Sequence, residues 1–417
     1  MRSRKNFVKV SLFYFGVFCL AVITLFRLIS SYRANPIIDY ICYLDCTMAL
    51  LKGLDCYEIS NLFLHEWDGP LIIYPGMTLY FIPWTFMSVK MSSLIYYVLS
   101  IAVTGVNFVL IFKITGLFKE IKFKDPDKYT YLFFFSGLLF FNSSPEMMCL
   151  RHGQSPTWSI LGILLFFHFT KPYSKTLTLG LAALMKYSMI TVFAPLLFAK
   201  RYYGICIIAF VIFLLLSSYL IYCGFDPFQY YIHYVEVLLG SIEKGYNSFS
   251  VSGYNMLQID FFRLDYLNGI CKLLLIAFAM YILFIERKHQ GIGLNLLLLI
   301  FCISMLISYH RLYDAGIIVL LLVKMNFLFR EKDWINLAVC ACFSLFYLVP
   351  LDMLFKVSDI LGAYPAFSNI FITCSFKNQY LHLLPLPSWS ILALACYAFY
   401  LYKKTDENFI FDLNFKH

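Results

Sequence analysis

The chain has 417 residues, of which 61% are hydrophobic and only 14% are charged. Soluble globular domains are nearer half apolar and a quarter charged, so this composition excludes a soluble domain and favours a protein embedded in lipid. The net charge of +9 does not indicate nucleic-acid binding, because the basic residues form short clusters between apolar runs, as in the cytoplasmic loops of membrane proteins.

Apolar runs follow one another along the whole chain, and many approach the roughly 20 residues that a helix needs to cross hydrocarbon. They lie near residues 10–30, 76–88, 92–112, 130–148, 157–170, 176–199, 203–222, 269–285, 292–309, 312–328, 335–351 and 387–402. The pattern predicts one all-α domain over residues 1–417, a polytopic transmembrane bundle of about 12 spans.

Lysine and arginine predict the orientation of these spans. The first run resembles a signal anchor that is retained. The basic clusters that follow the spans, such as 113–128 and 403–404, can all lie in the cytoplasm. Residues 31–91, 223–268 and 352–386 are then outer loops. This arrangement requires the 76–88 run to lie along the outer surface and the 176–199 run to turn back near Lys186. In the rival arrangement both runs cross the membrane, and residues 113–128 lie outside.

The 13 cysteines are scattered, mostly within apolar runs, and form no CxxC pair. Cys42 and Cys46 are one helical turn apart, but no histidine or second cysteine pair stands near them to complete a metal site. The cysteines are therefore interpreted as small buried residues, and no metal site is expected.

Two carboxylates, Asp39 and Asp45, follow the first span directly. A carboxylate at the membrane surface can accept a proton from an attacking hydroxyl group. The plainer alternative is a solvated acidic loop.

Several cations fall on the same predicted outer side. Arg151, His152 and Gln154 lie between two apolar runs, where they could equally cap a helix at the interface. Lys186 has apolar neighbours on both sides, which favours a cavity and a partner over snorkelling to the surface.

A third polar group interrupts a late apolar region, in the segment SYHRLYDAG. It contains His310, Arg311, Tyr313 and Asp314, and the alternative is an Arg311–Asp314 pair that caps two helices. Arginine and lysine bind phosphate. The three groups together therefore predict transfer of a group from a lipid phosphate to an alcohol.

The order of these motifs resembles the C-type (GT-C) membrane glycosyltransferases, and among them family 87, the polyprenol-phosphate-mannose-dependent mannosyltransferase-like group. The matching positions are Asp39, Tyr43, Gly53, Tyr57, Tyr74-Pro75, Gly153-Gln154, Lys186 and the residues Tyr309 to Asp314. Gly76 stands where the family pattern has a second proline.

The resemblance implies an enzyme that moves mannose or another sugar from a polyprenyl phosphate to a lipid or glycan acceptor. Transfer would proceed with inversion at the outer face of a bacterial inner membrane, without a metal or other cofactor. Asp39 would be the catalytic base, with Asp45 as the alternative. The donor phosphate would be bound by Lys186, Arg311, His310 and Arg151. The substrate cavity would be lined by Tyr43, Tyr57, Tyr74, Gln154, Tyr313 and Asp314. Competing hypotheses are a transporter or lipid flippase, although no internal repeat is visible, and a noncatalytic subunit of an envelope-polysaccharide system.

Overall fold

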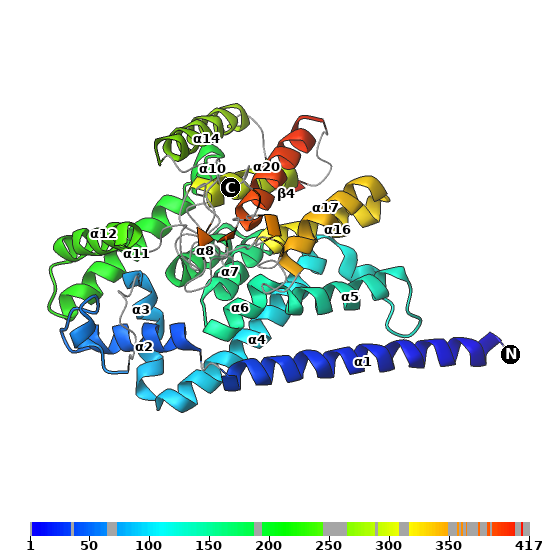
Figure 1. Cartoon of the computed structure of the whole chain (residues 1–417), viewed down its shortest axis with the longest axis horizontal. Helices are drawn as coiled ribbons and strands as arrows, with labels where there is room; N and C mark the ends of the chain where they lie inside the picture. The colour runs from blue at the N-terminus through cyan, green and yellow to red at the C-terminus, as the bar shows by residue number, and fades with distance from the viewer. Residues whose placement is uncertain are drawn as a thin grey trace.

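The architecture is known from a computed structural model that describes most of the chain (Figure 1). The described residues are 2–34, 37–64, 73–186, 194–244, 265–287, 291–307, 317–348, 386–404 and the short pieces 357, 360–361, 364, 374–375, 382–383 and 410–411.

Helices make up nearly all of the described structure. The first half contains α1 (Arg2–Ala34), α2 (Ile38–Leu51), η1 (Ile59–Asn61), α3 (Pro75–Phe81), η2 (Ile82–Phe86), α4 (Val89–Ile114), η3 (Leu117–Glu120), α5 (Lys128–Asn142), α6 (Ser144–His152), α7 (Pro156–His168) and α8 (Pro172–Met185). The second half contains α10 (Ala194–Ala199), α11 (Gly204–Tyr222), α12 (Pro227–Lys244), α14 (Asp265–Glu286), α15 (Leu294–Ile307), α16 (Ile317–Glu331), α17 (Trp334–Leu348) and α20 (Leu386–Lys404).

In the part of the chain that the structure describes, strands are confined to two short antiparallel pairs. β1 (Ile292–Gly293) pairs with β4 (Ile410–Phe411), and β2 (Cys374–Ser375) pairs with β3 (His382–Leu383). The prediction of a mainly helical architecture is therefore confirmed for the described residues.

Local chemistry explains where many helices begin. Proline occupies the first turn of α3, α6, α7 and α8, where its missing N–H has no helical partner to lose. The Asp127 carboxylate caps α5 by accepting the N–H groups of Tyr129 and Thr130, both at 3.1 Å, which satisfies donors that the helix itself leaves unpaired.

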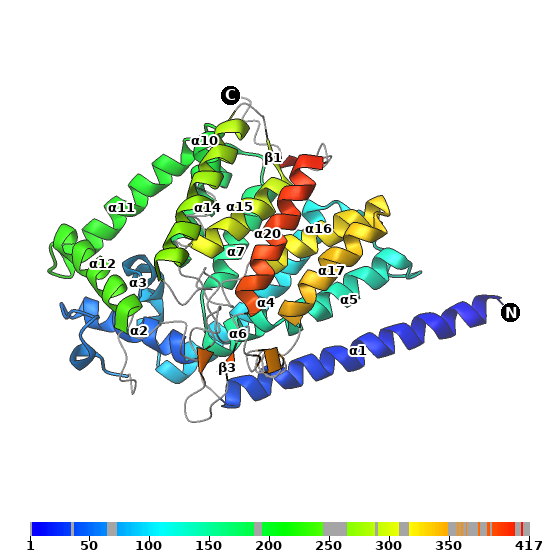
Figure 2. The ribbon, with the colours of Figure 1, turned by 45° about the horizontal axis from the view of Figure 1, so that its top comes forward.

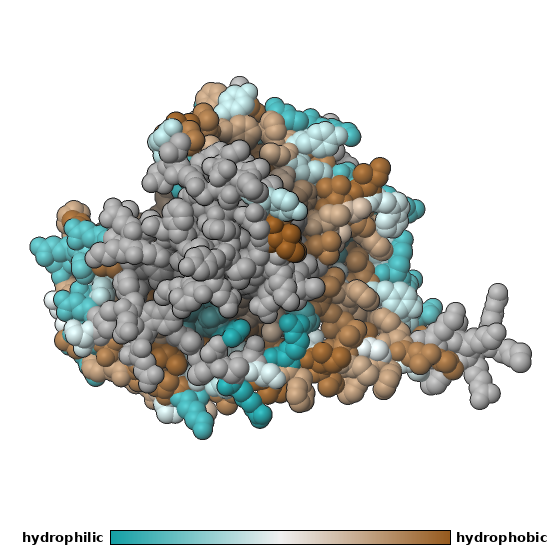
Figure 3. All heavy atoms as spheres, in the orientation of Figure 1, coloured by the Kyte–Doolittle hydropathy of each residue, from teal (hydrophilic) through white to brown (hydrophobic). Residues whose placement is uncertain are grey.

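Four described helices are long and apolar enough to cross a membrane. They are Val10–Ser30 within α1, Val89–Ile114, Gly204–Tyr222 and Tyr266–Glu286. Large apolar side chains cover α1, where Phe26 is 72% exposed, and Figure 3 shows this apolar surface continuing over neighbouring helices. The total of about 12 spans stays a prediction, because the other described helices are either shorter or less apolar than these four.

Two apolar runs prove to be broken. The 76–88 run forms the short helices α3 and η2, which together are too short to cross the hydrocarbon core. The 130–148 run divides into α5 and α6 at Ser143, whose backbone is extended. Neither run is a single continuous span.

The predicted turn near Lys186 is also present. α8 ends at Met185, and Lys186 has an extended backbone. The chain then returns, because the hydroxyl groups of Thr176, near the start of α8, and Tyr202, after α10, lie 2.6 Å apart. α8 packs closely on α7, where a Cβ atom at Gly162 would lie 2.7 Å from that of Ala182. Such small residues allow close helix contact in membranes.

Buried apolar side chains form two clusters. The larger one lies among α4, α7, α8, α15, α16 and α20. The second, which we call the outer-loop cluster, joins α2, α3, the start of α4, the end of α11 and α12. This second cluster supports the candidate site.

Candidate active site

A glycine turn brings α6 and α7 against the start of α2. Gly153 ends α6 in the left-handed conformation, with φ of 69°, which favours glycine. A Cβ atom at this position would lie 2.8 Å from the Cβ atoms of both Ile37 and Tyr40. The glycine therefore serves two purposes, the backbone turn and the close approach, and it places Gln154 beside Asp39.

Three of the predicted residues form one hydrogen-bonded chain. Asp39 and Tyr43 lie one turn apart on α2. The Tyr43 hydroxyl donates to Gln154 Oε1 at 2.7 Å, and Gln154 Nε2 donates to Asp39 Oδ2 at 2.5 Å. Because a carboxylate only accepts, it fixes which end of the amide faces Asp39. The buried tyrosine and glutamine thereby hold the carboxylate in a defined orientation.

The Asp39 carboxylate also remains open to other molecules. Its side chain is 32% exposed, and His152 Nδ1 lies 3.8 Å from Oδ2 at a similar exposure. A carboxylate that is oriented on one side and accessible on the other can accept a proton from a bound hydroxyl group.

Asp45, the alternative base, has a different environment. It is fully buried, and its two oxygens accept the backbone N–H groups of Phe63 and Leu64 at 2.8 and 2.9 Å. Both oxygens are therefore occupied in fixing the loop that follows α2. Cys42 lies between the two aspartates in the sequence. Burial and the charges of Asp39 and Asp45 raise the pKa of its thiol to about 12, so this cysteine stays protonated and is not a nucleophile.

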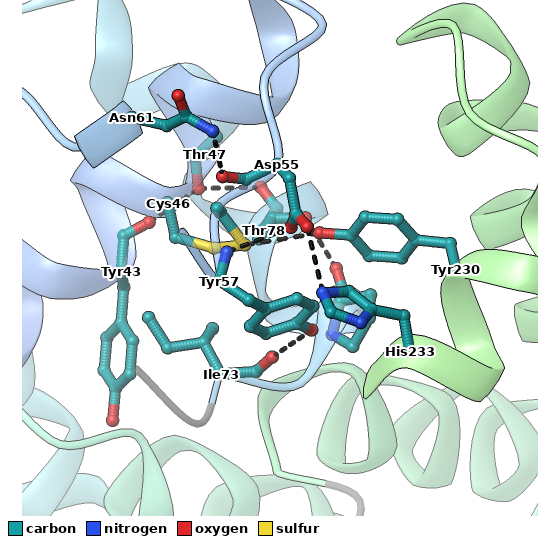
Figure 4. The surroundings of a disulfide bond; sticks show 12 residues. Tyr43, Cys46, Thr47, Asp55, Tyr57, Asn61, Ile73, Thr78, Tyr230 and His233 are labelled. Atoms are coloured by element: carbon teal, nitrogen blue, oxygen red, sulfur yellow. Dashed lines mark hydrogen bonds and ion pairs between the residues drawn. A yellow bond between two sulfur atoms is a disulfide. The ribbon is translucent and has the colours of Figure 1, made fainter. Parts of the chain in front are cut away.

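The loop after α2 is closed by a disulfide, shown in Figure 4. Cys46 on α2 is bonded to Cys56, ten residues later. The expectation that the cysteines are separate small buried residues is wrong for these two. Their short spacing in the first outer loop was the available signal. The bond restrains the turn that carries Asp55 and Tyr57.

Tyr57 and Tyr74 belong to an aromatic group on this loop and not to the hydrogen-bonded series that contains Asp39. The Tyr57 hydroxyl donates to the Ile73 carbonyl at 2.8 Å, and burial raises its pKa well above the usual value, so it remains a donor. The ring of Tyr74 lies over Gly76, where a Cβ atom would be 2.2 Å from it. A second proline in place of Gly76 would displace this ring.

The predicted cations are only partly described. Lys186 follows the end of α8, and its carbonyl oxygen lies 3.5 Å from the hydroxyl of Ser159. Ser159 is five residues beyond Gln154 in the sequence. The backbone of Lys186 thus lies against α7, the helix that begins just after Gln154. Arg151 is exposed in the last turn of α6. His310, Arg311, Tyr313 and Asp314 lie outside the described residues.

Sequence reasoning missed two polar groups. Glu146 on α6 is buried and accepts the hydroxyls of Thr104 on α4 and Thr157 on α7, so it joins the three helices around Gln154. A carboxylate within an apolar run was the signal. Asp55 pairs with His233 of α12 at 2.9 Å, a contact between distant segments that no local pattern indicates.

Among the described residues, no group of three or more His, Cys, Asp or Glu side chains could hold a metal ion. The absence of a required metal stays a prediction.

The comparisons with known proteins confirm the family that the chain resembles. The family model for glycosyltransferase family 87 matches residues 73–308. No curated protein and no solved structure matches the chain.

Proposed function

The chain belongs to glycosyltransferase family 87, and we propose that it transfers a sugar from a polyprenyl-phosphate donor to an envelope glycolipid or glycan acceptor. The donor sugar is mannose or another hexose or pentose. The reaction takes place at the outer face of a bacterial inner membrane.

The observation that carries this proposal is the Asp39–Gln154–Tyr43 chain. Asp39 accepts the proton of the acceptor hydroxyl while the hydroxyl oxygen bonds to the anomeric carbon. The bond from that carbon to the phosphate oxygen breaks, and the polyprenyl phosphate leaves with the electron pair. Attack opposite the leaving group inverts the anomeric configuration, and Gln154 keeps the Asp39 carboxylate aimed during the transfer.

Lys186, Arg311, His310 and Arg151 are proposed to bind the donor phosphate. The support is the charge of these residues and the position of the Lys186 backbone beside Ser159. In the donor a single phosphate joins the lipid to the sugar as a diester, and arginine and lysine alone can bind this one charged group, so the reaction is proposed to need no metal.

The outer orientation of the site is supported by the Cys46–Cys56 disulfide, since such bonds persist in oxidising compartments. The start of the first span and the end of α16 also contact the basic loop that is proposed to be cytoplasmic. Tyr14 donates to the carbonyl of Phe123 in the basic 113–128 loop at 2.5 Å. Arg330 donates to Thr115 in the same loop at 3.5 Å.

Replacement of the proposed base tests the function. Asp39→Asn keeps the shape of the side chain but cannot accept the proton, so kcat for sugar transfer by the purified protein in lipid should fall about 10²–10⁴-fold. Donor affinity and expression should remain near those of the wild type. Asp125→Asn, which neutralises an exposed carboxylate in the basic loop, is the matched control and should leave kcat unchanged. Turnover within a few-fold of wild type in Asp39→Asn would remove Asp39 from the mechanism.

The donor site has its own test. Lys186→Ala and Arg311→Ala should each weaken binding of a polyprenyl-phosphate sugar, because a charge-assisted contact contributes about 1.5–3 kcal/mol. Arg311→Lys should restore binding only in part, since the planar two-pronged contact is lost. Wild-type donor affinity in both alanine variants would contradict the phosphate assignment without affecting that of Asp39.

A further inference from the structure

Helix α12 follows α11 after a tight turn. Gly224 adopts a φ of 89°, and the Asp226 carboxylate accepts the N–H of Gln229 at 2.9 Å, which caps the new helix. Figure 2 shows α12 leaving α11 at a sharp angle instead of continuing its line. α11 is one of the helices able to cross the membrane, so α12 begins where that crossing ends.

Helix α12 has three distinct faces around its axis. One face is buried and carries Tyr230 and Tyr234. A second is polar and carries Gln229, His233 and Glu236. The third is apolar yet exposed, and it carries Phe228, Ile232 and Val235, which are 74%, 45% and 47% exposed. At 3.6 residues per turn each set falls on a separate stripe.

The buried and polar faces are both accounted for by the protein. Tyr234 packs on Tyr74 with ring centroids 6.2 Å apart, and Tyr57 packs on both buried tyrosines. His233 reaches the Asp55 carboxylate in the first outer loop at 2.9 Å (Figure 4). α12 is therefore fixed in rotation, and its apolar stripe is held away from the outer-loop cluster.

The direction of that stripe is given by Tyr231, at the border of the apolar and buried faces. Its ring stacks on Phe213 of α11 with centroids 5.9 Å apart. Phe213 belongs to a flank of α11 on which Phe210 and Leu214 are also exposed, as expected of a helix surface that faces lipid. The stripe of α12 is continuous with this flank.

We infer that α12 lies flat in the lipid–water interface on the side of the Asp39 site, with Phe228, Ile232 and Val235 inserted among the lipids. A helix with one apolar face, one polar face and aromatic residues at the border has the composition of an interfacial membrane helix. Through the His233–Asp55 pair, the bilayer surface thereby sets the height of the first outer loop. This inference does not depend on the proposed sugar transfer.

Fluorescence quenching in nanodiscs that hold one copy of the full chain tests the assignment. Phe228→Trp and Ile232→Trp add a fluorophore to the apolar stripe, and Gln229→Trp and Glu236→Trp are matched controls on the polar face. The emission of the added tryptophan is obtained by subtracting the wild-type spectrum. Lipids brominated near the headgroup should quench the first two at least several-fold more than the controls.

Equal quenching on the two faces would overturn the inference. So would emission at short wavelength from Phe228→Trp and Ile232→Trp without quenching by brominated lipid, because the stripe would then be covered by protein. The use of two positions on each face keeps the test valid where one variant fails to fold.

Discussion

At the scale of single residues, two aspartates six positions apart on α2 have different surroundings, and for this reason we propose different tasks for them. Asp39 has one oxygen held by Gln154 and a side chain that is partly open. Asp45 has both oxygens on backbone N–H groups and is buried. The motif order included Asp39, Tyr43 and Gln154 among its matches, and the structure brings these three together. The motif order could not reveal the surroundings of Asp45, because the partners of this carboxylate are main-chain groups of a loop without a sequence signature.

Asp45→Asn tests this division. The amide can still accept one N–H but points its own NH₂ group at the other, so a buried donor is left unpaired at a cost of about 1–3 kcal/mol. We expect a lower midpoint of thermal unfolding in detergent, with kcat per folded molecule reduced far less than in Asp39→Asn. A kcat loss as large as that of Asp39→Asn, with unchanged stability, would reverse the two roles.

At the scale of elements, the α6–α7 turn is the piece on which the geometry of the site depends. Gly153 combines a left-handed backbone with contact to two Cβ atoms of α2. The Gly153-Gln154 pair could be recognised from the sequence as a family motif. The reason for the glycine could not, because it depends on which residues pack against this position. The return of the chain at Lys186 was predictable, because a lone charge in an apolar run and the basic clusters on either side indicate the same turn.

Gly153→Ala should destabilise the protein through both backbone strain, about 1–3 kcal/mol, and the clash with Ile37 and Tyr40. Gly224→Ala separates the two effects, since Gly224 also has a positive φ but nothing within 4 Å of an added Cβ. Thermal unfolding should show a larger loss for Gly153→Ala. The transfer rate should fall only in that variant, because the turn carries Gln154. Similar losses in both variants would mean that the close approach contributes little.

At the scale of the whole molecule, composition was enough to predict a helical membrane protein. It was not enough to predict the number of spans. The apolar runs near 76–88 and 130–148 are interrupted at Pro83 and at Ser143 to Pro145, and these local cues are short. Run length alone therefore overestimates the number of continuous membrane-spanning helices.

The ends of α10, α14 and α20 are joined by the ion pair of Lys200 and Glu286 at 2.8 Å and by Tyr402, which donates to the same carboxylate at 2.6 Å.

Orientation can be measured by labelling intact cells with an impermeant thiol reagent. In a background without the exposed cysteines 206, 342 and 396, Ser60→Cys in the first outer loop should react and Lys122→Cys in the basic loop should not. Permeabilising the membrane should make Lys122→Cys reactive. Reaction of Lys122→Cys in intact cells would place residues 113–128 outside and favour the rival arrangement.

The bond between Cys46 and Cys56 also has a consequence for biogenesis. In the proposed orientation, α2 and the turn that the disulfide restrains leave the reducing cytosol before the two thiols are oxidised. A newly inserted chain would then complete its first outer loop only after translocation. Maturation of the protein then depends on the thiol-oxidising capacity of the compartment that it enters. Cells in which that capacity is blocked should accumulate inserted, full-length chains that carry two additional reactive thiols, detectable by a shift in mass after alkylation.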